Sequence, residues 1–122
     1  MALILGENKV HELSLADSMV REIEEIIKKE NAEKVFSVTV EMGKFSGVER
    51  EPFEFAFPLV AEGTPVEGSK LIIEIAPGIV KCSDCQEDTI LDVPFIKCGK
   101  CNSRNVSFIK GRDLLIKSLE IE

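Results

Sequence analysis

The chain has 122 residues and a net charge of −7 at pH 7, with 44% hydrophobic and 30% charged residues. This composition predicts a folded domain, or a compact domain with a small insert, and excludes a disordered chain. The negative charge argues against a general nucleic-acid binder, because phosphate contacts need a basic surface. The first residues lack a basic flank and a long apolar stretch, and no segment has the length of a membrane span. We therefore expect a cytoplasmic protein that is not bound to a membrane.

Two segments have the periodicity of amphipathic helices. The first helix is predicted over residues 14–30, with Ser14 as its N-cap and Asn31 ending it in a left-handed conformation. Its apolar stripe consists of Leu15, Met19, Ile23, Ile26 and Ile27. The second helix is predicted over residues 52–60. A kink or an early end is expected at Pro58, because its nitrogen has no hydrogen to donate within a helix.

Three segments have the patterns of strands. Residues 36–42 and 70–75 alternate between the two faces of a sheet, and Phe36 is expected on the buried face of the first. A third strand is predicted over residues 114–121, after a turn at Gly111. With the two helices, these strands predict an α+β fold.

The segment between the second and third predicted strands differs from the rest of the chain. Residues 80–110 contain every cysteine and few long apolar runs. We expect this segment to be a small inserted domain with its own means of support. The main domain is then residues 1–79 plus 111–122.

The cysteines form two C-x-x-C pairs, Cys82 with Cys85 and Cys98 with Cys101, separated by twelve residues. Each pair can form a tight turn that directs both sulfurs at one centre, and two such turns complete a tetrahedral zinc site. An insert of about thirty residues buries too little apolar surface to fold alone. Structural zinc contributes on the order of 10 to 16 kcal/mol in small peptides. We therefore expect one structural zinc(II) ion with no open position for catalysis.

Three other interpretations of the two C-x-x-C pairs remain. An iron centre could use the same ligands, whereas a dithiol redox pair would leave the second C-x-x-C unexplained. A zinc ribbon can also be an adaptor that binds protein or nucleic acid. From Lys81 to Lys110 the insert has five Lys/Arg and four Asp/Glu, which is a weak basis for binding phosphates.

With the cysteines bound to metal, no nucleophile–histidine set remains, so we do not expect an enzyme.

His11 is the only histidine of the chain. Alone, a histidine ahead of a helix is more often a surface or cap residue than a ligand. However, the segment His11-Glu-Leu-Ser-Leu-Ala16 resembles the amino-terminal His-Glu motif of the HypA/HybF family of hydrogenase maturation factors, which supply nickel. Further similar segments, in the order that the family uses, are Phe53 to Phe57, Glu62 to Thr64, Leu71 to Glu74, the two C-x-x-C pairs and Gly111 to Glu120.

The resemblance implies a nickel-binding domain of two helices on a three-stranded mixed sheet, with an inserted zinc ribbon. It implies that nickel(II) is a transient cargo bound by the histidine side chain and neighbouring backbone nitrogens, with Glu beside it. Carried over by position, the nickel site would comprise His11, Glu12 and the backbone of Val10. The implied partners are a nickel-handling GTPase accessory protein, the large subunit of a [NiFe]-hydrogenase and, in some cases, urease accessory proteins.

This chain departs from the family motif at its amino terminus. The motif begins Met-His-Glu, whereas nine residues precede Val10 here, so no free terminal amine adjoins His11. One hypothesis is that Val10 is the natural start, read as Met from a GTG codon, and that residues 1–9 come from an upstream start. The alternative is an added edge strand over residues 2–5, with an altered or lost nickel site and an adaptor function. The sequence leaves the oligomeric state open.

Overall fold

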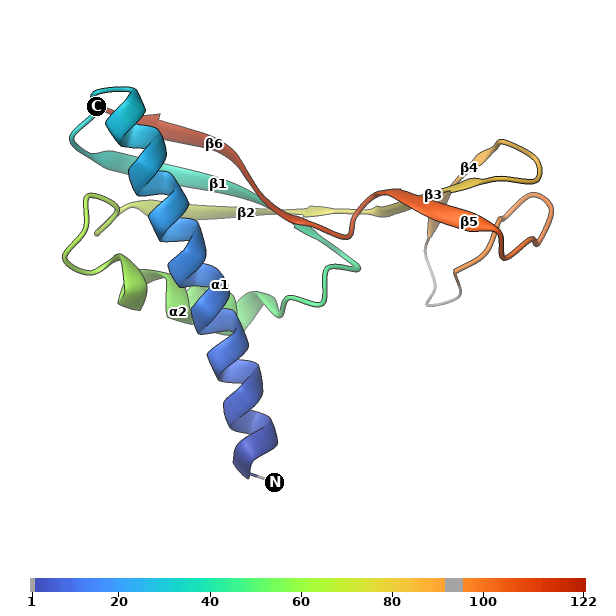
Figure 1. Ribbon diagram of the computed structural model, residues 1–122, viewed down its shortest axis with the longest axis horizontal. Helices are drawn as coiled ribbons and strands as arrows, with labels where there is room; N and C mark the ends of the chain where they lie inside the picture. The colour runs from blue at the N-terminus through green and yellow to red at the C-terminus, as the bar shows by residue number, and fades with distance from the viewer. Residues whose placement is uncertain (1, 92–95) are drawn as a thin grey trace. The chain divides into compact units, whose positions relative to one another are not determined.

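A computed structural model describes the backbone of residues 2–91 and 96–122, and the side chains of residues 11–91 and 96–122. The elements, shown in Figure 1, are α1 (Ala2–Lys29), β1 (Val35–Gly43), α2 (Arg50–Ala61), β2 (Lys70–Ala76), β3 (Gly78–Cys82), β4 (Asp88–Leu91), β5 (Val106–Lys110) and β6 (Leu114–Ile121). The strands form two three-stranded sheets with the orders β2-β1-β6 and β4-β3-β5. The predicted α+β class, with two helices and a three-stranded sheet, is confirmed.

The first helix begins earlier than its apolar pattern predicts. Helix α1 starts at Ala2, so Ser14 is not an N-cap and residues 2–5 are helical instead of an edge strand. Residues 2–13 contain no proline, and extending an existing helix requires no new nucleation. The expected end is confirmed, since Asn31 follows the helix with a φ of 54°. Neither helix of the described chain is long and apolar enough to cross a membrane.

The sheet that contains β1 is mixed. At the ends of β1 and β2, the N–H of Lys44 donates to the carbonyl of Ala76, so these strands run parallel and α2 is the connection between them. The N–H of Glu122, at the end of β6, donates to the carbonyl of Lys34, just before β1. Strands β1 and β6 therefore run antiparallel, and the mixed sheet that the resemblance implied is present.

The helices and β1 contribute to an apolar core. Its buried side chains include Met19, Val20, Ile23 and Ile27 of α1, Phe53, Ala56, Phe57 and Ala61 of α2, and Val35, Val38 and Val40 of β1. The rings of Phe53 and Phe57 lie 6.1 Å apart between centroids. Pro58 lies inside α2, where it is exposed, and the helix continues to Ala61. The expectation for Phe36 is wrong, because its side chain is 44% exposed.

The chain divides into two compact units. The nickel unit comprises residues 1–40, 48–72 and 116–122, and the cysteine unit comprises residues 41–47 and 73–115. The nickel unit has eight Lys/Arg and fifteen Asp/Glu, whereas the cysteine unit has seven of each. The whole net charge of −7 therefore belongs to the nickel unit. An independent zinc domain over residues 80–110 stays a prediction.

Gly111 joins β5 to β6 in a conformation that only glycine adopts easily, with a φ of +95°. A β-carbon at this position would overlap the carbonyl oxygen of Pro77, which is backbone and cannot rotate away. We expect Gly111→Ala to lower the free energy of unfolding by at least about 3 kcal/mol in denaturant titrations. Gly47→Ala is the matched control, because Gly47 has a φ of +79° but open space around it. In that variant the free energy of unfolding should fall by only about 1 kcal/mol. An equal decrease in both variants would contradict the steric argument.

Candidate metal sites

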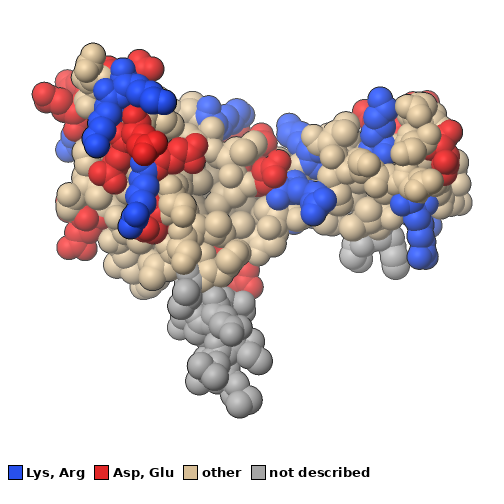
Figure 2. Space-filling model, in the orientation of Figure 1, with Lys and Arg blue, Asp and Glu red and all other residues tan. Residues whose placement is uncertain are grey.

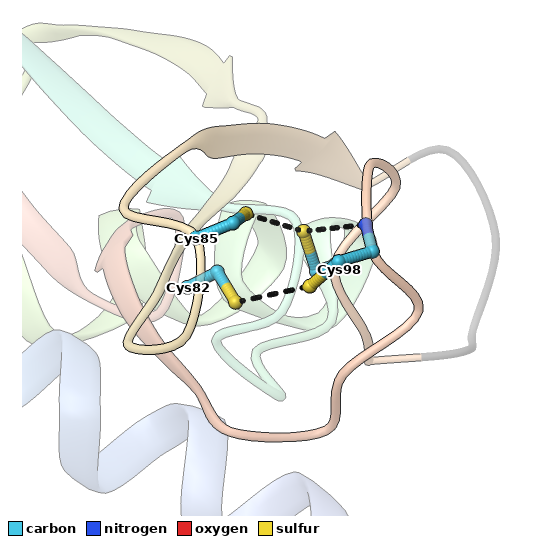
Figure 3. A group of neighbouring side chains, drawn as sticks. Cys82, Cys85 and Cys98 are labelled. Carbon is cyan, nitrogen blue, oxygen red and sulfur yellow. Dashed lines mark hydrogen bonds between the residues drawn. The ribbon is translucent and has the colours of Figure 1, made fainter.

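The four cysteines meet at two turns of the cysteine unit. Cys82 ends β3 and Cys85 follows in the next turn, while Cys98 and Cys101 lie in the turn that precedes β5. All four sulfurs lie within 4.8 Å of one another. Two of the Sγ–Sγ distances are 3.6 Å, between Cys82 and Cys101, and 3.5 Å, between Cys85 and Cys98. Figure 3 shows the labelled cysteines directing their sulfurs toward one centre.

A zinc ion fits this group of sulfurs. Tetrahedral bonds of about 2.3 Å place the sulfurs of a zinc site roughly 3.8 Å apart, close to the shortest distances here. Disulfide sulfurs lie only about 2.05 Å apart, and all four cysteines are free. The four-cysteine cluster therefore has the geometry of a zinc site, as the spacing predicts. A zinc ion bound there would cross-link the two turns and have every position filled by sulfur.

The two turns share one backbone geometry. The N–H of Gln86 donates to the carbonyl of Cys82 at 2.9 Å, and the N–H of Asn102 donates to that of Cys98 at 3.1 Å. Gln86 and Asn102 have φ values of 65° and 61°, in the left-handed region. The sequence analysis did not single out these two residues. Both residues could have been predicted from their position directly after a C-x-x-C pair. A chain that closes a tight turn there needs a residue that tolerates a positive φ.

The backbone prepares one cysteine to bind metal. The N–H groups of Cys101 and Lys100 donate to the Cys98 sulfur at 3.4 and 3.3 Å, and they lower the pKa of Cys98 to about 6. At Cys85, a hydrogen bond from the backbone of Glu87 lowers the pKa, but burial and the neighbouring thiols outweigh it. The pKa of Cys85 is thereby raised to about 12. At neutral pH and without metal, Cys98 is therefore a thiolate, whereas Cys85 keeps its proton.

Zinc affinity should increase with pH. At neutral pH, Cys98 has already lost its proton, whereas Cys85, with its pKa of about 12, must release one when metal binds. Cys101 must release another: a hydrogen bond from the backbone of Ser103 lowers its pKa, but the thiol of Cys82 and desolvation together outweigh this effect and raise it. We expect the logarithm of the zinc association constant to rise by at least about two per pH unit between pH 7 and 8. Chelator competition measures this slope, and a constant affinity would contradict it.

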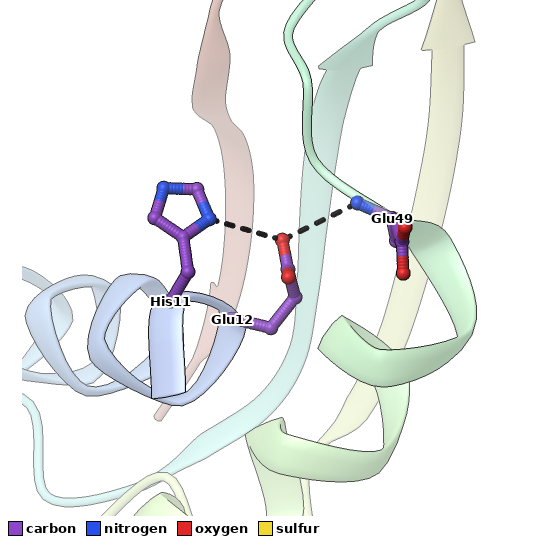
Figure 4. Close-up of polar contacts among 3 residues, drawn as sticks. All are labelled: His11, Glu12 and Glu49. Atoms are coloured by element: carbon purple, nitrogen blue, oxygen red, sulfur yellow. Dashed lines mark hydrogen bonds and ion pairs between the residues drawn. The ribbon is translucent and has the colours of Figure 1, made fainter. Parts of the chain in front are cut away.

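The second candidate site lies near the amino-terminal half of α1. The His11 side chain is 58% exposed, whereas that of Glu12 is 3% exposed. Nδ1 of His11 lies 3.4 Å from Oε2 of Glu12, and the same oxygen accepts a hydrogen bond of 3.3 Å from the N–H of Glu49. Figure 4 shows the Glu12 carboxylate between the other two residues. Since Glu49 is the N-cap of α2, Glu12 connects His11 to the start of the second helix.

This arrangement leaves Nε2 of His11 away from Glu12. A carboxylate that contacts one imidazole nitrogen and orients the ring is a frequent outer partner of metal-binding histidines. Val10 and His11 lie inside α1, where backbone N–H groups donate to carbonyls four residues earlier. The structure thus brings His11 and Glu12 together but keeps the neighbouring backbone nitrogens within the helix. Among the described side chains, the cysteines are the only group of three or more candidate metal ligands within reach of one another.

Comparison with known proteins decides the family. A family model described as hydrogenase/urease nickel incorporation, metallochaperone, HypA matches residues 10–121. The chain belongs to the HypA family. A hydrogenase maturation factor HypA from Aquifex aeolicus is 38% identical over 93% of this chain and 98% of its own. A solved solution structure of the Ni metallochaperone HypA from Helicobacter pylori has a TM-score of 0.74 and 29% identity, covering 90% of this chain and 96% of that one.

Membership of the HypA family confirms several predictions. The resemblance seen in the sequence is correct, and so is the predicted class of function, a nickel metallochaperone for hydrogenase and urease maturation. This class is not catalytic. The similarity to the solved HypA structure also confirms the fold. The nickel site at His11, Glu12 and Val10 and the zinc ligands at the cysteines stay predictions.

Proposed function

We propose that this chain binds nickel(II) at His11 as transient cargo and passes it to a maturation partner. The observation that carries the proposal is the contact of His11 with the buried carboxylate of Glu12, in a chain of the HypA family. Glu12 is the one buried charged residue among the described side chains. Burial of a carboxylate is costly unless it has polar partners. Glu12 has two, because it contacts the imidazole of His11 and accepts a hydrogen bond from the N-cap residue of α2.

The proposed nickel site combines the imidazole of His11 with backbone nitrogens at Val10 and Glu12. Nickel(II) favours square-planar sets of nitrogen ligands, which supports this choice. Because the backbone of these residues is helical, the nitrogens become available only when α1 opens there. In the closed helix, the imidazole of His11 alone remains as a nitrogen donor. The side chain of Glu12 positions the imidazole in that state.

We propose that Cys82, Cys85, Cys98 and Cys101 hold one structural zinc(II) ion. The sulfur distances and the lowered pKa of Cys98 support this assignment. Thiolates are soft ligands, and four of them in a tetrahedron suit zinc or an iron centre. The cluster lies in a small three-stranded sheet with few fully buried apolar side chains, which supports a structural zinc ion.

We propose three partners that match the family description of hydrogenase and urease nickel incorporation. They are a nickel-handling GTPase accessory protein, the large subunit of a [NiFe]-hydrogenase and urease accessory proteins. We place this activity in the cytoplasm, where cysteines stay reduced. The four free cysteines support that placement.

Nickel titration of the full chain tests the proposed function. We expect His11→Ala to weaken nickel binding by more than the roughly 10- to 100-fold that the loss of an outer partner costs, because it removes a ligand. Zinc should stay at about one ion per chain, measured by metal analysis of the same samples. Ser14→Ala, an exposed change one turn away, is the control. Nickel binding that is unchanged in His11→Ala, or absent from the parent chain, would instead favour a zinc-ribbon adaptor.

A further inference from the structure

An apolar groove of about 550 Å³ lies between α1 and α2 in the nickel unit. It is lined by Leu13 of α1 and by Glu51, Pro52, Phe55, Ala56 and Leu59 of α2. The exposed fractions of Phe55, Leu59 and Leu13 are 73%, 53% and 41%. Two of its lining residues, Leu13 and Glu51, follow Glu12 and Glu49, which are hydrogen-bonded to each other, by one and two residues.

The exposed apolar side chains of this groove, Leu13, Phe55 and Leu59, are not part of the core of the nickel unit. Helix α2 buries Phe53 and Phe57, whereas Phe55 and Leu59 project on another side of the helix. Positions 52, 55, 56 and 59 have the spacing of one helical face, so α2 carries a second apolar stripe. In Figure 2, the surface over α2 is mainly uncharged, while charged side chains gather over the C-terminal end of α1. A contiguous exposed apolar surface of this kind marks an interaction site.

Charge indicates which kind of partner fits. Glu51 lines the groove, and the nickel unit carries the whole net charge of −7. The nearby Glu54 already pairs with Arg50, at 3.0 Å between Nε and Oε1. Two copies of this chain facing each other across the groove would bring like charges together, which disfavours a homodimer here. A basic partner would gain both apolar contact and attraction.

We propose that the groove docks a maturation partner through an amphipathic helix with basic residues beside its apolar face. This inference rests on the proposed function, because it gives the nickel donor a surface that holds the acceptor. Phe55 is the apolar anchor of the groove. Glu51 attracts the basic edge of the incoming helix.

The test measures the affinity of the full chain for the purified nickel-handling GTPase of the same organism, at low and high salt. We expect Phe55→Ser to weaken binding by about 10- to 100-fold, the typical loss for a central aromatic anchor. Phe36→Ser is its control, because Phe36 is an exposed phenylalanine of β1 outside the groove. Glu51→Lys should weaken binding by about 3- to 10-fold at low salt and reduce its salt dependence. Glu25→Lys makes the same charge change on α1 and should have a smaller effect.

The outcomes separate this inference from the nickel function. Weaker binding in both groove variants, with the controls and the His11-dependent nickel titration unchanged, supports the groove as the docking surface. Equal binding by Phe55→Ser and Phe36→Ser would overturn it even if nickel binding is intact. Affinity of the parent chain weaker than about 100 µM would overturn it too. A dimer of this chain that Phe55→Ser dissociates would assign the groove to a second copy and overturn the proposed partner. Loss of nickel binding by the parent chain would count against the proposed function alone.

Discussion

Replacing Cys98 with Ser should abolish zinc binding at the proposed site and unfold the cysteine unit while the nickel unit stays folded. The Cys98 sulfur is fully buried and accepts two backbone hydrogen bonds, so its turn is organised around the thiolate. Structural zinc sites contribute on the order of 10 to 16 kcal/mol in small peptides, which exceeds what a small sheet can supply alone. The few fully buried apolar side chains of this sheet include Val80. We therefore expect its fold to depend on a metal cross-link between the turns.

Amide hydrogen exchange and metal analysis measure this outcome separately for each unit. We expect amides of β3 and β5 to lose protection in Cys98→Ser, while those of α1 and of residues 35–40 of β1 keep it. Ser83→Ala is the matched control, since Ser83 is exposed and lies between two of the cysteines. Metal analysis of the parent chain also distinguishes zinc from iron. A variant that loses its metal but keeps a protected cysteine unit would show that zinc is not structural.

A shortened chain that begins with Met in place of Val10 should bind nickel more tightly than the full chain, on the order of 100-fold. In the full chain, α1 runs from Ala2 through His11, which holds the backbone nitrogens in helical hydrogen bonds. In the shortened chain, these N–H groups belong to the first turn and have no helical partner. A terminal amine then also adjoins His11. The full nitrogen set that nickel(II) prefers becomes available without unwinding a helix.

The comparison needs the full chain, the shortened chain and His11→Ala in each. Calorimetry gives the nickel affinity, and the absorbance of square-planar nickel reports the nitrogen donors. The gain from shortening should disappear in His11→Ala, because the imidazole completes the same set. If both chains bind nickel equally tightly, the helical backbone does not limit the site and the ligands lie elsewhere. Zinc content serves as the internal control for folding.

Much of this protein was predictable from local sequence. The two C-x-x-C pairs predicted the four-cysteine cluster, because tight turns of this spacing direct both sulfurs to one side. The strand over residues 114–121 was predicted with the bounds that the structure has. The His-Glu segment and the order of the other matching segments predicted the HypA family. Each C-x-x-C pair, the strand pattern and each matching segment is a signal of a few neighbouring residues, and the resemblance adds their order along the chain.

Other features depended on contacts between residues far apart in the chain. The role of Glu12 comes from its hydrogen bond with the backbone of Glu49, 37 residues away, which no local pattern indicates. The exposure of Phe36 and Phe55 was likewise decided by which faces of β1 and α2 remained uncovered after packing. The start of α1 was also predicted wrongly. Ser14 is a good N-cap, but a helix that has already begun at Ala2 continues through it. The sequence by itself thus determined the fold class, the cysteine cluster and the family. Tertiary structure alone decided how His11 is held and where an apolar groove opens between α1 and α2, because both depend on the packing of these helices.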